Sequence, residues 1–172
     1  MDSAPQEAVD ARRALRHVAA KGLAAALDND SVASRPLLVP VAVGIDEARA
    51  NLLESRGAFL DKLGFDLRRV APESVSCRGI PTVLATALPE TLVFSVADAL
   101  TVEGLRLEST HAPSVLFDAV IGQCDLTAAW SWDREAMDDL LRQLERYQVA
   151  PRVQGGEAVW RQLGGDDIAA LL

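Results

Sequence analysis

The chain has 172 residues, of which 49% are hydrophobic and only 5% aromatic, and it carries a formal net charge of −8. The hydrophobic fraction excludes a wholly disordered chain, and the length suffices for one domain or two small lobes with a core of Leu, Val and Ala. The acidity excludes a general-purpose binder of phosphate backbones, because such binders need many cationic contacts.

The N-terminal elements are predicted to be a loop, a helix and an apolar strand. Residues 1–6 form the loop, and the Ala-rich stretch 9–27 has its apolar residues at helical spacing. The strand 34–44 contains Pro36 and Pro40. Because Pro lacks the N–H that a central strand needs, this strand is predicted to lie at the edge of a sheet. The alternative is a linear peptide displayed for a partner, and the residues alone leave both interpretations open.

The middle of the chain predicts a helix followed by a pair of strands. Asp46 is a suitable N-cap for the helix, which runs to Leu63 and ends before a glycine. The strands are predicted at 65–70 and 74–80 with turn residues between them, as in a hairpin. A further helix is predicted from 88 to about 100.

The C-terminal third predicts two helices, a strand and a last helical turn. The first helix runs from Pro113 to Cys124, and the second is capped by Ser131. The strand covers 157–163 and the helical turn 164–172. The second helix carries an apolar stripe formed by Met137, Leu140, Leu141, Leu144 and Tyr147. The order of elements indicates an α+β, or mixed α/β, fold.

The sequence contains no nucleophile elbow, P-loop, dinucleotide-binding loop or zinc-protease motif. His17 and His111 have no metal-ligating residue at suitable spacing, and Cys77 and Cys124 lie far apart without a Cys-x-x-Cys pair. Two lone cysteines, no secretory leader and no apolar stretch of membrane-spanning length together favour a cytoplasmic protein. We therefore expect a non-catalytic association module without a cofactor.

Five stretches follow one another in a distinctive order: "RPLLVP", "DKLGFDLRRV", "SVSCRGIPTVL", "WSWDREAMDDLLRQLE" and "GGEAVWRQLGGDDIAALL". Together they resemble one known family, the C-terminal domain of the bacterial DNA mismatch repair protein MutL. Each is weak by itself, but their order and spacing match the family from Val9 to Leu172.

The resemblance implies a domain of two lobes. A dimerisation lobe would combine residues 1–44 with 148–172, so that strands 34–44 and 157–163 could share one sheet, and a mainly helical regulatory lobe would be inserted at 45–147. The family domain opens with two strands before its first helix, whereas this chain begins almost at that helix. We therefore expect the lobe to lack those strands and the chain to be a fragment or a shortened relative. The dimer interface is expected at Val41, Val43, Val159, Trp160, Leu163 and Ile168.

The resemblance also implies a role in joining proteins. In the family, this domain pairs two full-length chains that each carry an N-terminal ATPase domain. The homodimer passes mismatch detection by MutS to a downstream nicking endonuclease and a helicase, and this domain itself contacts DNA only weakly.

Many relatives are metal-dependent endonucleases with an Asp-x-His motif and two spaced Glu on the first helix. This chain has Asp10 at the matching place, but Arg12 replaces the His and no Glu follows. The family's Cys-x-His and Cys-Pro-His stretches are missing as well. Without those ligands no divalent ion can be held to activate water, so the chain resembles the branch that does not nick DNA. The alternatives are a nicking endonuclease with an unrecognised metal site and an unrelated small-molecule-binding regulatory domain.

The family's sliding-clamp peptide consists of a leading Gln followed by Pro, aliphatic residues and Pro. Here Arg35 replaces the Gln, so a planar amide is lost and a cation takes its place. If that amide is buried and paired in the clamp complex, its loss weakens binding by about 1–3 kcal/mol. A weak clamp contact is therefore expected, and it is compatible with an edge strand. The contact residues would be Pro36, Leu37, Leu38, Val39 and Pro40.

Overall fold

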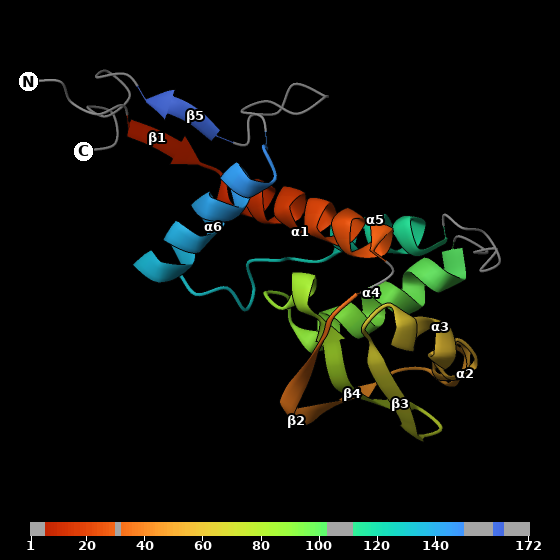
Figure 1. Cartoon of the computed structure of the whole chain (residues 1–172). Coiled ribbons are helices and arrows are strands. Elements are labelled where there is room, and N and C mark those ends of the chain that lie inside the picture. Colours follow the sequence, from red (N-terminus) through yellow and green to blue (C-terminus); the bar gives the residue numbers. More distant parts are fainter. Residues whose placement is uncertain (1–5, 30–31, 103–111, 150–159, 164–172) are drawn as a thin grey trace, which may run out of the picture. The chain divides into compact units, whose positions relative to one another are not determined.

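The computed structural model describes residues 6–29, 32–102, 112–149 and 160–163 (Figure 1). The fold is mixed α/β, as predicted. The chain forms two compact units: residues 1–18 with 132–172, and residues 19–131. The predicted lobe boundaries at 44/45 and 147/148 stay a prediction. No helix in the described ranges combines the length and the apolar character that crossing a membrane requires.

The first unit contains a two-stranded antiparallel sheet made from opposite ends of the sequence. Strand β1 (Gln6–Val9) pairs with β5 (Trp160–Leu163), and the two lie side by side in Figure 1. Helix α1 (Ala11–Asp28) follows β1. The prediction of a loop was therefore wrong at Gln6, and the prediction of a helix was wrong at Val9 and Asp10. A four-residue strand is too short to show a clear alternation of apolar and polar residues.

Helix α6 (Arg134–Arg146) also belongs to the first unit. Its N-cap is Asp133, whose side chain accepts a hydrogen bond from the Ala136 N–H at 2.8 Å, so the prediction of Ser131 as the cap was wrong. Asp and Ser are equally good caps, and the sequence did not distinguish two candidates two residues apart. Leu140 and Leu144 are the buried residues of the helix.

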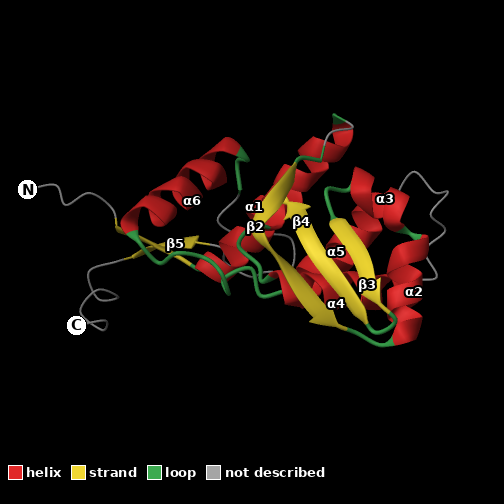
Figure 2. Cartoon of the chain, turned by 90° about the horizontal axis from the view of Figure 1, so that it is seen from below, coloured by secondary structure: helices red, strands yellow, loops and turns green. Residues whose placement is uncertain are grey.

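The second unit contains an antiparallel sheet of three strands in the order β2-β4-β3 (Figure 2). The strands are β2 (Ser34–Gly44), β3 (Asp66–Ala71) and β4 (Ser74–Pro81). The predicted edge position of the Pro-containing strand and the predicted hairpin of the other two are confirmed. The expected sheet of strands 34–44 and 157–163 was wrong, because β2 pairs with β4 while β5 pairs with β1.

The helices of the second unit pack on one another and against the sheet. The predicted helix from Asp46 to Leu63 is two helices with a break at Arg56. The predicted cap is confirmed, since Asp46 Oδ1 accepts from the Arg49 N–H at 2.9 Å. Gly64 adopts φ +83° after the second helix, a conformation that favours glycine. The helices and the 3-10 turn η1 are α2 (Glu47–Ser55), α3 (Gly57–Lys62), η1 (Thr82–Leu84), α4 (Pro89–Val102) and α5 (Ala112–Gln123).

The core of the second unit lies between the sheet and these helices. Helix α4 contacts β2, β4 and α5, while α2 contacts β3 and β4. The rings of Phe65 and Phe117 stack with their centroids 6.0 Å apart. Val43 and Val75 are opposite each other in the ladder and are both buried, which identifies the face of the sheet that turns inward. The largest fully buried side chains are Phe65, Phe117, Leu53, Leu60, Leu84, Leu92, Leu116 and Leu126.

Arg69 ties the β3–β4 hairpin to helix α2. Its guanidinium donates to the side chains of Asn51 and Glu54, the latter at 3.1 Å, and to the backbone carbonyls of Ala71 at 3.3 Å and Pro72 at 3.1 Å. The side chain is only 19% exposed. Because a single guanidinium binds acceptors on helix α2 and on the turn between β3 and β4, Arg69 fixes the hairpin on the helix.

We expect Arg69→Ala to lower the free energy of unfolding by about 1–3 kcal/mol, since it leaves several acceptors without their charged donor. Arg68 is the matched control, because it lies on the same strand but is 49% exposed in its ion pairs with Asp61 and Asp66. Arg68→Ala should lower the free energy by at most about 1 kcal/mol. Urea unfolding of both variants measures the difference, and equal effects would contradict the anchoring role of Arg69.

Candidate functional site

The candidate site is the segment Pro36–Pro40, here named the Pro-framed peptide, which bulges from the edge strand β2. In the β2–β4 ladder Pro36 is opposite Gly79 and Val41 is opposite Cys77. The four residues 37–40 therefore lie opposite Arg78 alone, where a regular strand would have one residue. An insertion of this size bends the strand away from its partner while the ladder holds both ends.

The side chains of the Pro-framed peptide are accessible. Leu38 is fully exposed and Val39 is 75% exposed, whereas Leu37 is half-buried. Pro36 and Pro40 are exposed at the two ends. A contiguous run of exposed apolar side chains is a common mark of an interaction surface, whereas single exposed apolar residues are ordinary. The predicted contact residues are thus brought together and presented to solvent.

Two cations lie next to this apolar run. Arg35 is exposed at the start of β2 and forms no ion pair within the described ranges. Arg78, on the opposing strand, is 58% exposed, and its Nε lies 3.9 Å from Asp66 Oδ2. Sequence reasoning missed Arg78, because only the register of the ladder places it opposite the bulge. A partner of the Pro-framed peptide therefore meets Leu38 and Val39 with positive charge nearby.

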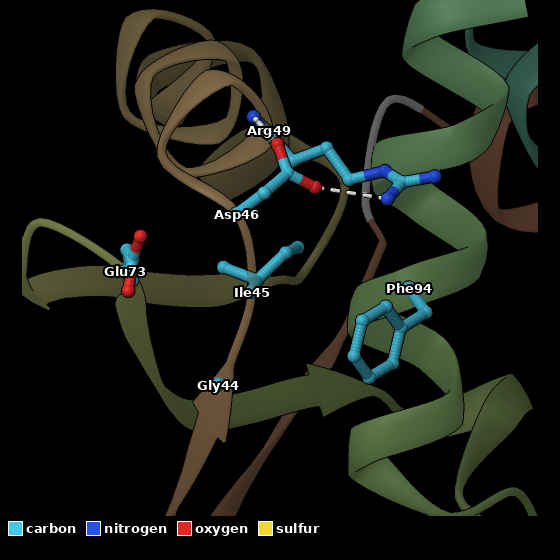
Figure 3. A pocket seen from close by; sticks show the side chains of 6 residues that line it. All are labelled: Gly44, Ile45, Asp46, Arg49, Glu73 and Phe94. Carbon is cyan, nitrogen blue, oxygen red and sulfur yellow. Dashed lines mark hydrogen bonds and ion pairs between the residues drawn. The ribbon is translucent and has the colours of Figure 1, made fainter.

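A separate open hollow of about 420 Å³ lies where β2 leads into α2 (Figure 3). Arg49 lines it and forms ion pairs with Asp46 at 2.9 Å and with Asp98 of α4 at 2.6 Å. The backbone N–H of Arg49 and then its guanidinium lower the pKa of Asp46, and these carboxylates raise the pKa of Arg49. The lining residues are Gly44, Ile45, Asp46, Arg49, Glu73 and Phe94.

The charges at this hollow already have a structural use. The Asp46 carboxylate caps α2, and Arg49 joins α2 to α4, so these groups compensate one another. Phe94 is 40% exposed at the rim, so the hollow is open rather than closed around a ligand. It does not match the closed apolar pocket with convergent polar groups that a small-molecule-binding domain would need.

Both cysteines are buried thiols that are not part of a disulfide. Burial raises the pKa of Cys77 to about 11, so this thiol is protonated at neutral pH and is a poor nucleophile or metal ligand. The Cys124 thiol donates to Ser95 Oγ at 3.2 Å. The two cysteines therefore serve the core of the second unit.

Asp10, the residue that matches the endonuclease motif, is engaged by the helix that follows it. Its Oδ1 accepts from the Arg13 N–H at 3.1 Å, and its Oδ2 lies 3.5 Å from Arg13 Nε. Among the residues that the structure describes, no group of three or more His, Cys, Asp and Glu side chains converges as a metal site would require. His111 lies outside the described ranges.

Those residues expected at the dimer interface that the structure describes are divided between the two sheets. Val43 is buried on the inner face of the three-stranded sheet, and Val41 is half-buried on the same strand. Trp160 and Leu163 are the end residues of β5. Val159 and Ile168 lie outside the described residues. Their assignment to an interface stays a prediction.

Comparison with known proteins identifies the family. A family model described as "MutL C terminal dimerisation domain" matches residues 8–116. The chain is 28% identical over 167 residues to the DNA mismatch repair protein MutL of Pseudomonas aeruginosa (strain LESB58), covering 95% of this chain and 26% of that protein. MutL of Xanthomonas axonopodis pv. citri (strain 306) is 28% identical over 160 residues, covering 93% of this chain and 26% of that protein.

The chain thus spans about a quarter of the length of the curated relatives it matches. The matched region includes helix α1, the Pro-framed peptide and the three-stranded sheet. The resemblance seen in the sequence is confirmed, and this chain belongs to the MutL C-terminal dimerisation domain family.

Proposed function

We propose that this domain joins two copies of its chain in DNA mismatch repair and recruits partners to the pair, without catalysing a reaction itself. The observation that carries the proposal is the match to a dimerisation-domain family over residues 8–116. The pairing of β1 with β5 supports it, because a unit assembled from residues near both ends of the chain resembles the dimerisation lobe predicted at 1–44 and 148–172. The region 45–147 would then act as the regulatory lobe.

The intact chain is expected to have the molar mass of a dimer in light scattering across a concentration series. Deleting residues 148–172 removes β5 and leaves β1 without its ladder partner, so the mass should fall to that of a monomer. The control is Leu38→Ala with Val39→Ala, which changes exposed side chains of the Pro-framed peptide and should leave the mass unchanged. A monomeric intact chain at every concentration would contradict the proposed dimerisation.

We further propose that the Pro-framed peptide is a contact for the DNA sliding clamp. Leu38 and Val39 supply the apolar anchors that docking of an extended peptide requires, and the bulge raises them from the sheet. Arg35 at the leading position presents a cation where the family has a glutamine amide. A weak contact follows, since the clamp pocket would have to accept a guanidinium in place of that amide.

Replacing Arg35 by Gln should strengthen clamp binding by about tenfold or more, because it restores an amide that both donates and accepts. Leu38→Ala should weaken binding by a similar factor through lost apolar burial. Val70→Ala is the control, because Val70 is 60% exposed on β3 of the same sheet but lies outside the peptide. Titration of a labelled clamp by fluorescence anisotropy measures all three. Equal affinities for the intact chain and Leu38→Ala would reject the site.

The remaining partners are proposed from the family alone. They are a MutS-like protein, a separate nicking endonuclease and a helicase, with only weak contact between this domain and DNA. A cytoplasmic location is proposed with them. The need for a separate endonuclease follows from the first helix, where Arg12 stands in the place of the family's metal-binding His.

The intact chain is accordingly expected not to nick supercoiled plasmid when manganese is titrated, because Asp10 lacks the neighbouring imidazole and carboxylates that would hold a divalent ion. Conversion of supercoiled to open-circular DNA on a gel is the measurement. Nicking that rises with manganese and is abolished by Asp10→Asn would instead support the endonuclease alternative.

A further inference from the structure

Helix α6 exposes part of its apolar surface. Met137 and Leu141 are 36% and 40% exposed, whereas Leu140 and Leu144 are buried. Residues four positions apart lie on one side of a helix, so Met137 and Leu141 form a short continuous strip, here named the α6 stripe. The fold therefore buries only part of the apolar side of α6 and leaves this stripe exposed.

Charges of alternating sign run along the outer border of the α6 stripe. In order along the helix they are Arg134, Asp138, Arg142 and Glu145. The spacing of four, four and three residues keeps them on one side of the helix, next to the stripe. All four are exposed, and within the described part of the chain they form no ion pair. Four charges beside an exposed apolar strip are thus available to a partner.

Along the helix these charges read plus, minus, plus, minus. A second copy of the helix that runs in the opposite direction therefore brings opposite charges together. In an antiparallel pair of α6 helices centred between residues 139 and 140, Arg134 of one copy is level with Glu145 of the other. Asp138 then lies within one residue of the level of Arg142, and Met137 within one residue of the level of Leu141. A two-fold axis repeats each pairing, so four opposite-charge pairs border two apolar contacts. In a parallel two-fold pair the charged borders of the two copies would instead lie on opposite sides of the seam, so these charges would not pair.

We propose that the α6 stripe and its four bordering charges form a docking surface for α6 of a second copy of this chain, in the antiparallel arrangement. The inference rests on the proposed dimerisation and specifies one surface for it. Helix α6 lies in the region predicted as the regulatory lobe, 45–147, but it belongs to the same compact unit as β1 and β5. Sequence periodicity alone does not identify this surface, because it does not distinguish Met137 and Leu141 from the buried leucines of the same stripe.

Charge reversal tests this arrangement in the full chain. One variant combines Arg134→Glu with Arg142→Glu, and a second combines Asp138→Arg with Glu145→Arg. In a homodimer of either variant every bordering pair joins like charges. The dimer dissociation constant should therefore rise by about tenfold or more at low ionic strength, and by less at high salt. Sedimentation velocity across a concentration series measures this constant.

Two controls separate the docking surface from a folding defect. An equimolar mixture of the two variants should form a heterodimer with the affinity of the intact chain, because every pair is again of opposite sign. A single chain with all four substitutions should also dimerise normally. Arg134→Glu places an acid in the first turn of α6 and Glu145→Arg places a base in its last turn, and both changes suit the helix dipole. Thermal unfolding should therefore confirm that each variant folds.

The outcomes distinguish this inference from the proposed function. If the intact chain dimerises and both double variants dimerise equally well, α6 is not the interface while dimerisation stands. If the double variants dissociate and neither the mixture nor the fourfold variant restores the dimer, the antiparallel pairing is overturned. If the intact chain is a monomer, the proposed dimerisation itself fails. Loss in each double variant with recovery in both controls would establish the docking surface.

Discussion

The ladder between β2 and β4 is the constraint on which the candidate peptide depends. It pairs Ser34–Pro36 on one side of the bulge and Val41–Gly44 on the other, so the four residues between them are forced outward. Strand β4 can hold both segments because its hairpin partner β3 is fixed on helix α2 by Arg69. Arg69 thereby adds to the support that the packing of α2 and α4 gives to the sheet and its register.

Local elements were largely predictable from the sequence, whereas pairing between distant segments was not. Periodicity and caps identified α2 at Asp46, the hairpin at 66–81 and the edge position of β2, because each is encoded within a few residues. The strand that pairs with β2 was mispredicted. An apolar edge strand can form its ladder with any neighbouring strand, so its sequence does not identify which one. The break at Arg56 and strand β1 were missed because they are short and lack a distinct pattern.

The candidate site shows the same division between residue type and placement. The apolar anchors Leu37, Leu38 and Val39 stay a prediction from the sequence, and in the structure Leu38 and Val39 are exposed while Leu37 is half-buried. The bulge and the position of Arg78 beside it depend on ladder register. Family membership identifies a dimerisation domain, whereas the proposal that it does not nick DNA rests on single positions such as Arg12. The scaffold alone therefore does not decide between those two functions.

The bulge also affects the entropy of binding. A free peptide must lose backbone freedom when it docks, at roughly 1–2 kcal/mol for each residue that becomes ordered. Part of that freedom is already lost in the Pro-framed peptide, since the ladder pairs the residues at both its ends and its two prolines fix φ. For the proposed partner this preorganisation would lower the entropy cost of docking. The same sequence in a flexible tail would need a larger contact area to reach equal affinity.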